Sequence, residues 1–184
     1  MKKIISLMIL LFFIICTHIV IDYRHYKKIY HLTDQAFIEY DLKKIELLEK
    51  EVASTLNKKR LFPNLWIDWF FERDKQMLFH LKKYENYLSL LEKNAGSNLS
   101  NDLSICLLKD KLKEKNMNCY QDVKDKYFTV PEYDNLEFWT IHILLNKEIA
   151  IQDLNKISNK IIYDMANSML KKSKQEIIIE LYPD

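Results

Sequence analysis

Hydrophobic residues fill almost every position of segment 4–21, and charged residues return at Asp22. As an α-helix this segment would reach roughly 27 Å, about the thickness of the hydrocarbon core of a bilayer. The residues beyond it alternate between apolar and charged positions, as in water-soluble helices. We therefore expect residues 1–3 to form a cytoplasmic tail, residues 4–21 a transmembrane signal anchor, and residues 22–184 a soluble helical domain.

Two other uses of the apolar segment stay open. A cleaved signal peptide carries small residues before its cleavage site, but no alanine or glycine occurs between Ile4 and Tyr30. A lipoprotein would carry its lipid on Cys16, but two isoleucines stand in front of that cysteine. Basic residues flank the segment on both sides in nearly equal number, so charge alone does not fix the orientation. Because a very short leading tail usually stays in the cytoplasm, we expect a bacterial inner-membrane protein with its C-terminal domain in the periplasm or another extracytoplasmic space.

After the apolar segment, hydrophobic residues recur at spacings of three and four, the period of an amphipathic helix. The expected helices cover residues 26–40, 42–56, 65–92, 102–115, 131–145 and 151–172, and polar links are expected at 57–64, 96–102 and 129–131. Side chains suited to helix N-termini occur at Asp41, Asn64 and Asp102. The tail 175–184 contains three consecutive isoleucines, which favours a short edge strand or an extended peptide docked on the domain.

Composition narrows the fold class. The 184 residues include one glycine and three prolines, whereas sheet-rich domains need glycine in their tight turns. We therefore expect an all-α protein with about six or seven helices after the apolar segment, arranged as an irregular helical bundle or a short array of helical hairpins. The net charge of +2 gives no sign of a nucleic-acid-binding surface.

Two similar segments favour the hairpin array. DLKKIELLEK at 41–50 and YENYLSLLEK at 84–93 share their last four residues and lie 43 residues apart. Each resembles the second helix of a tetratricopeptide (TPR) repeat, and this resemblance covers ten residues twice. The usual period of about 34 residues and the small residues at the helix crossing are missing, so an irregular bundle stays the alternative.

Cys106 and Cys119 are the two cysteines outside the apolar segment. In an exported domain they would be a disulfide pair. If the helix around Cys106 continued to residue 115, however, Cys106 would lie roughly 13 Å along the axis from the turn that carries Cys119. The bridge therefore requires an early helix end or a chain that doubles back, and two buried free thiols are the alternative.

Bulky aromatic side chains surround the first turns of the expected helix 65–92. Trp66, Trp69, Phe70 and Phe71 cover nearly every face of these turns, and a helix that is apolar all round is buried or lies against lipid. Core packing, contact with the membrane interface and contact with a partner protein are the three interpretations of these aromatics.

The sequence contains no recognisable catalytic, cofactor-binding or metal-binding pattern. The five histidines occur singly, and no glycine-flanked serine or glycine-rich phosphate loop is present. His18 in the apolar segment is either a functional intramembrane group or a side chain turned toward the lipid head groups, and His142 is expected in the core.

We therefore expect an exported, membrane-anchored domain that binds a protein partner, such as a bacterial toxin-immunity or inhibitor protein, and not an enzyme. The first alternative is a structural accessory subunit of an envelope or secretion complex. The second is an envelope hydrolase with carboxylates at Asp68, Glu72, Asp122 and Glu137.

Overall fold

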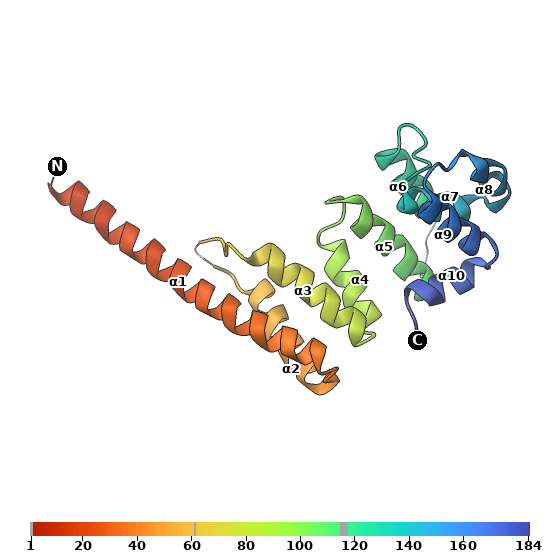
Figure 1. The fold of residues 1–184 in the computed structure, drawn as a ribbon. Coiled ribbons are helices and arrows are strands. Elements are labelled where there is room, and N and C mark those ends of the chain that lie inside the picture. The colour runs from red at the N-terminus through yellow and green to blue at the C-terminus, as the bar shows by residue number, and fades with distance from the viewer. Residues whose placement is uncertain (1, 61, 115–117) are drawn as a thin grey trace. The chain divides into compact units, whose positions relative to one another are not determined.

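The computed structural model describes residues 2–60, 62–114 and 118–184, and these residues form ten α-helices and one short 3-10 helix (Figure 1). None of the described residues lies in a β-strand. The predicted all-α class is therefore confirmed, while the helix number exceeds the expected one. The chain divides into two compact units, residues 1–81 and residues 82–184. The assignment of residues 1–3, 4–21 and 22–184 to a cytoplasmic tail, a membrane span and a soluble domain stays a prediction.

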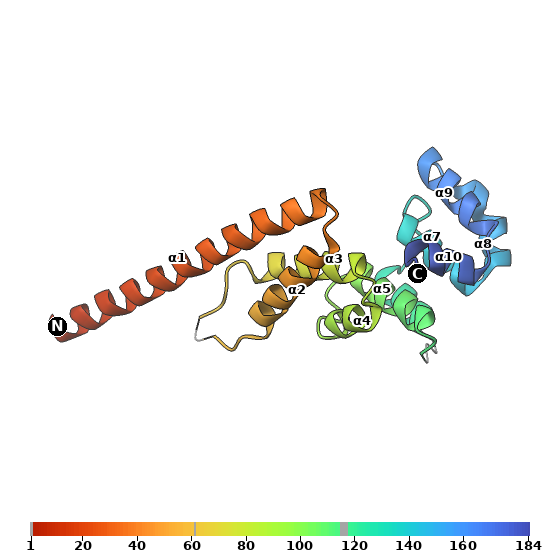
Figure 2. The ribbon, with the colours of Figure 1, turned by 90° about the horizontal axis from the view of Figure 1, so that it is seen from below.

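The first unit contains one long helix and two shorter ones: α1 (Lys2–Ile38), α2 (Leu42–Asn57) and α3 (Ile67–His80). From Ile5 onward α1 is long and apolar enough to cross a membrane, and none of its most apolar stretch is buried. Figures 1 and 2 show the N-terminal half of α1 extending beyond α2 and α3. The apolar segment 4–21 and most of the helix expected over 26–40 are parts of this one continuous helix.

A tight turn folds α2 back onto α1. Tyr40 adopts a left-handed conformation with a φ of 51°, and the Asp41 carboxylate accepts a hydrogen bond of 3.0 Å from the Lys44 backbone N–H. This is the predicted N-cap, which satisfies one of the free N–H groups at a helix start. Side chains of all three helices form the core of this unit, with these buried residues: Ile29, Ala36, Ile45, Leu48, Val52, Phe70 and Met77.

The described residues of the second unit form seven α-helices: α4 (Tyr84–Glu92), α5 (Leu99–Lys111), α6 (Cys119–Tyr127), α7 (Leu136–Leu145), α8 (Lys147–Asp153), α9 (Lys160–Leu170) and α10 (Lys174–Leu181). The 3-10 helix η1 (Leu154–Lys156) follows α8. Helix α7 lies at the centre, because α5, α6, α8 and α9 all contact it. Its Trp139 is fully buried and donates an indole N–H bond of 2.6 Å to the Tyr133 carbonyl.

Two long helices expected from the pattern are broken in the structure. The helix expected over 65–92 is two helices, because Lys82 takes a left-handed conformation with a φ of 55° between α3 and α4. The helix expected over 151–172 is interrupted by the turn in which Asn159 caps α9. Since apolar spacing continues across both breaks, the pattern alone joins helices that backbone turns separate.

The expected tail strand was wrong. Residues 174–181 form α10, and Ser173 and Glu176 build a capping box at its start. The Ser173 hydroxyl accepts a bond from the Glu176 N–H, and the Glu176 carboxylate accepts one from the Ser173 N–H. This reciprocal cap outweighs the β-preference of the three isoleucines, two of which, Ile177 and Ile178, are buried.

Three expected helix starts also differ. Asn64 does not cap α3 but accepts a bond from the Trp66 N–H two residues on, which is an Asx turn. Asn98, not Asp102, caps α5. Helix α7 begins with the cap Asn135 instead of at Pro131.

Asp102 has another role, inside α5. It accepts hydrogen bonds from the Gly96 N–H, the Lys126 ammonium and the Tyr127 hydroxyl. Burial alone would raise the pKa of Asp102, but these three bonds hold that pKa below its usual value. Gly96, the only glycine, has a φ of 81° and therefore occupies the left-handed position expected for it.

Candidate functional site

A cavity of about 790 Å³ opens in the first unit between α1, the end of α2 and the segment that leads from α2 to α3. We call it the α1 cavity. One part of its wall is apolar and consists of Ile15 and Ile19 from α1 with Phe62 and Leu65 from the connecting segment. Leu65 is 66% exposed, so this wall is open to the surroundings.

Another part of the wall is charged, and an ion pair joins it to α1. Arg60 donates a hydrogen bond to the Asp22 carboxylate, and both side chains are largely buried. The Arg60 Nε–H lies buried without a hydrogen-bond acceptor among the described residues. Because Asp22 directly follows the apolar segment, this pair places the start of the α2–α3 connection where the apolar segment ends.

A second polar cluster lines the cavity between α1 and α2. His25 Nε2 lies 2.9 Å from the Thr55 hydroxyl oxygen, and the Glu51 carboxylate lies 3.8 Å from His25 Nδ1 and 3.4 Å from Lys28 Nζ. Burial lowers the pKa of His25, with Lys28 and Arg60 acting in the same direction and Glu51 opposing them. The imidazole is therefore neutral at pH 7 and hydrogen-bonds to Thr55.

Lys58 and Lys59 complete the charged wall, and both are exposed. The two carboxylates of the cavity, Asp22 and Glu51, already pair with Arg60 and Lys28. Neither Lys58 nor Lys59 forms an ion pair within residues 2–60, 62–114 and 118–184. The wall therefore presents two positive charges that no carboxylate of the cavity neutralises.

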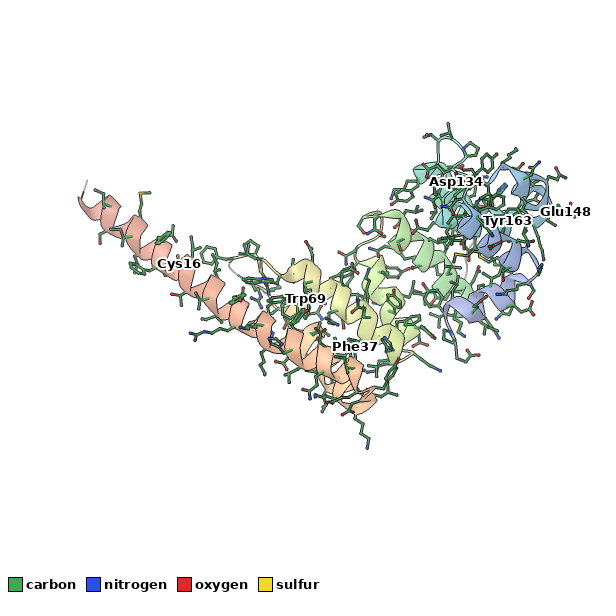
Figure 3. All side chains as sticks on the ribbon, in the orientation of Figure 1. Cys16, Phe37, Trp69, Asp134, Glu148 and Tyr163 are labelled. Carbon is green, nitrogen blue, oxygen red and sulfur yellow. A yellow bond between two sulfur atoms is a disulfide. The ribbon has the colours of Figure 1, made fainter. Side chains whose placement is uncertain are left out.

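The predicted aromatic cluster lies beside this cavity and packs against α1. Trp66 stacks on Tyr26 with ring centroids 5.6 Å apart, and Trp69 meets the same tyrosine edge-on at 4.9 Å. Figure 3 shows Trp69 between α3 and α1. Phe70 is fully buried, and Phe71 is half-buried. Contact of Trp66, Trp69 and Phe71 with a membrane or a partner stays a prediction.

In the second unit the structure joins Cys106 and Cys119 in a disulfide with a Cα–Cα distance of 5.7 Å. The obstacle foreseen in the sequence is absent, because α5 ends at Lys111 and Lys113 adopts a left-handed φ of 58°. Helix α6 starts at Cys119, which the bridge joins to the buried Cys106. Cys16 in α1 is a free thiol.

The two histidines discussed in the sequence analysis, His18 and His142, lie in different surroundings. His18 is exposed on α1, and its ring lies 5.6 Å from that of Phe62. His142 is buried in α7, with Nε2 3.3 Å from the Asp153 carboxylate. Burial lowers the pKa of His142, and Lys124 acts in the same direction while Asp153 opposes it.

The four carboxylates considered for hydrolysis belong to three helices. Asp68 and Glu72 belong to α3 of the first unit, where Glu72 lies 2.8 Å from Lys75 Nζ. Asp122 and Glu137 belong to α6 and α7 of the second unit. Within the part of the chain that the structure describes, no three histidine, cysteine or acidic side chains gather in a way that could hold a metal ion.

Comparison of the chain with protein-family models, with curated proteins and with solved structures gives no match. The α1 cavity therefore has to be interpreted from its own chemistry. The sequence analysis missed it, because residues 57–64 were expected to be only a polar link. The sequence feature that could have indicated the cavity is the basic run at 58–60, which is followed within six residues by Phe62, Leu65 and Trp66.

Proposed function

We propose that this chain is a membrane-anchored envelope protein whose helical second unit binds a protein partner, as a bacterial toxin-immunity or inhibitor protein does. In this proposal residues 4–21 of α1 cross the inner membrane, and residues 22–184 lie in the periplasm or another extracytoplasmic space. The TPR-like arrangement stays a prediction, since the two similar segments fall in α2 and α4, in different units.

The observation that carries the proposal is an exposed apolar face on α9, one of the four helices that contact α7. The buried side of α9 consists of Ala166 and Leu170. Ile161 and Met165, one helical turn apart, are 69% and 44% exposed. The apolar arc of α9 is thus wider than the core requires, and its outer part is available to a partner.

The neighbouring helix α8 also exposes apolar side chains. Ile149 and Ile151 are 46% and 55% exposed, and α8 contacts both α7 and α9. Figure 3 labels Glu148 on α8 and Tyr163 on α9, a charged and an aromatic residue of the same two helices. Apolar residues with a polar border are the usual composition of a protein-binding patch.

Export is supported by the disulfide. A bridge between Cys106 and Cys119 persists in oxidising compartments and is rare in the cytosol. A long apolar N-terminal helix together with a bridged second unit fits a chain that is inserted by α1 and exported beyond it.

The test combines topology with capture. A reporter fused after Asp184 should be active outside the cytoplasm, and affinity capture from crosslinked membranes should recover one stoichiometric protein. The variant Ile161→Glu/Met165→Glu should lose this protein. The control Asn86→Glu/Ser89→Glu adds the same charge at exposed polar positions of α4 and should retain it. Equal recovery with both variants would refute the α9 face, and a cytoplasmic reporter would refute export.

A further inference from the structure

We propose that the α1 cavity binds the head group of an anionic phospholipid from the membrane that α1 crosses. This inference rests on the membrane anchorage proposed above, but not on the identity of the protein partner or on the side of the membrane that the second unit occupies. It assigns a ligand of defined chemistry, a phosphodiester on a diacylglycerol, to residues contributed by α1, α2 and the α2–α3 connection.

The positive charge of the cavity favours a negatively charged ligand. Asp22 and Glu51 are engaged by Arg60 and Lys28, so Lys58 and Lys59 remain as uncompensated cations at an exposed wall. Basic residues beside a membrane helix attract anionic head groups. A zwitterionic head group would bring its own cation toward these lysines and is therefore disfavoured.

The position of the cavity along α1 favours a lipid over a free phosphate compound as the ligand. The cavity extends from Ile15, within the apolar segment, to His25 beyond it, which is roughly 15 Å along the helix axis. Arg60 is bonded to Asp22, so the basic run lies where the apolar segment ends. Head groups occur at this level of a bilayer.

The apolar wall suits the acyl chains of the same ligand. Ile15 and Ile19 belong to the apolar segment and line the cavity, as do Phe62 and the exposed Leu65. A ligand whose charged end contacts Lys58 and Lys59 would therefore direct its chains along α1. The volume of about 790 Å³ falls in the range of roughly 300 to 1,000 Å³ that small-molecule sites occupy.

Trp66 lines the cavity and provides the assay. The full-length chain is placed in phosphatidylcholine nanodiscs that contain a small fraction of phosphatidylglycerol brominated near the head group, and quenching of tryptophan fluorescence is measured. Brominated phosphatidylcholine at the same fraction gives the reference. We expect half-maximal quenching at a lower mole fraction of phosphatidylglycerol than of phosphatidylcholine.

The variant Lys58→Gln/Lys59→Gln should raise the phosphatidylglycerol fraction needed by roughly 25-fold, since one basic residue at an anionic surface contributes about fivefold. The control Lys43→Gln/Lys50→Gln removes the same charge from exposed positions of α2 outside the cavity and should leave the fraction unchanged. High salt should reduce the preference of the unmodified protein in the same direction, because the lysines are exposed. That measurement tests the proposal even if the double variant loses its helical circular dichroism.

Three results would overturn the inference: equal quenching by the two lipids, an equal effect of the cavity and control variants, or loss of the preference when free glycerol 3-phosphate is added. The last would identify a soluble phosphate compound as the ligand. Carbonate extraction separates this failure from failure of the proposed function. A chain that stays in the membrane without a lipid preference refutes only the lipid site, whereas a chain released by carbonate refutes the anchorage and the lipid site together.

Discussion

Removal of the Cys106–Cys119 bridge should destabilise the second unit strongly. The two cysteines are 13 residues apart in the sequence, and a bridge closing a loop of this length restricts the unfolded chain by about 3 kcal/mol. For a unit of this size, residues 82–184, a loss of 3 kcal/mol lowers the melting temperature by roughly 12 to 24 °C. We therefore expect a shift of this size for Cys119→Ser relative to the oxidised protein.

Thermal unfolding of the full-length chain in detergent, followed by circular dichroism, measures this shift. Cys16→Ser is the matched control, because Cys16 is the free cysteine in α1 and its hydroxyl replacement leaves the bridge intact. Reduction of the unmodified protein should reproduce the Cys119→Ser result. Melting temperatures for Cys119→Ser, Cys16→Ser and the oxidised protein within about 2 °C of one another would refute the reasoning, since 1 kcal/mol alone shifts a domain of this size by about 4 °C or more.

The oxidation state of Cys106 and Cys119 in cells indicates the compartment in which the second unit lies. In cells treated with a thiol-reactive mass tag before lysis, an exported second unit should leave Cys106 and Cys119 untagged until a reductant is added. Tagging of both without reductant, after denaturation in the presence of the tag, would show that the bridge does not form in the cell. The support that the disulfide gives to export would then be lost.

Three further predictions concern stability. Phe70→Ala should lower the free energy of unfolding by about 3 to 5 kcal/mol, because Phe70 is fully buried. The control Leu65→Ala, at a largely exposed site, should change this free energy little. Similar losses for the two variants in denaturant titrations would contradict the burial of Phe70. Ser173→Ala should cost about 1 kcal/mol through loss of the α10 cap, and a melting curve identical to that of the unmodified protein would show that the cap contributes nothing. Because the folded-state pKa of His142 is lowered, the unfolded chain binds the proton more readily, so stability should be fully present above about pH 6.5 and decline as the pH falls below it. In unfolding measurements from pH 7.5 to 5, His142→Gln should flatten this decline, and an unchanged slope would exclude His142 as a source.

Features that depend on neighbouring residues could be predicted from the sequence, whereas features that depend on distant parts of the chain could not. The left-handed Gly96 and the N-cap Asp41 were predicted because each depends on a few consecutive residues. The disulfide stayed open in the sequence, because its geometry depends on where α5 ends, and a left-handed Lys113 was not signalled by residue type. The α1 cavity was missed altogether. Its two halves are about 40 residues apart in the sequence and meet through the Arg60–Asp22 pair.

The sequence by itself determined the helical class and the long apolar N-terminal helix, because hydrophobic spacing, uninterrupted apolar length and scarcity of glycine act locally. It did not determine where long apolar patterns break, since backbone turns at Lys82 and Asn159 leave the spacing of apolar residues intact. Only the tertiary structure decided which side of an apolar helix is covered. Ile161 and Ala166 belong to the same apolar arc, yet packing against α7 buries the alanine and leaves the isoleucine exposed. Burial is decided by neighbours from distant parts of the chain, and periodicity within one helix carries no information about them.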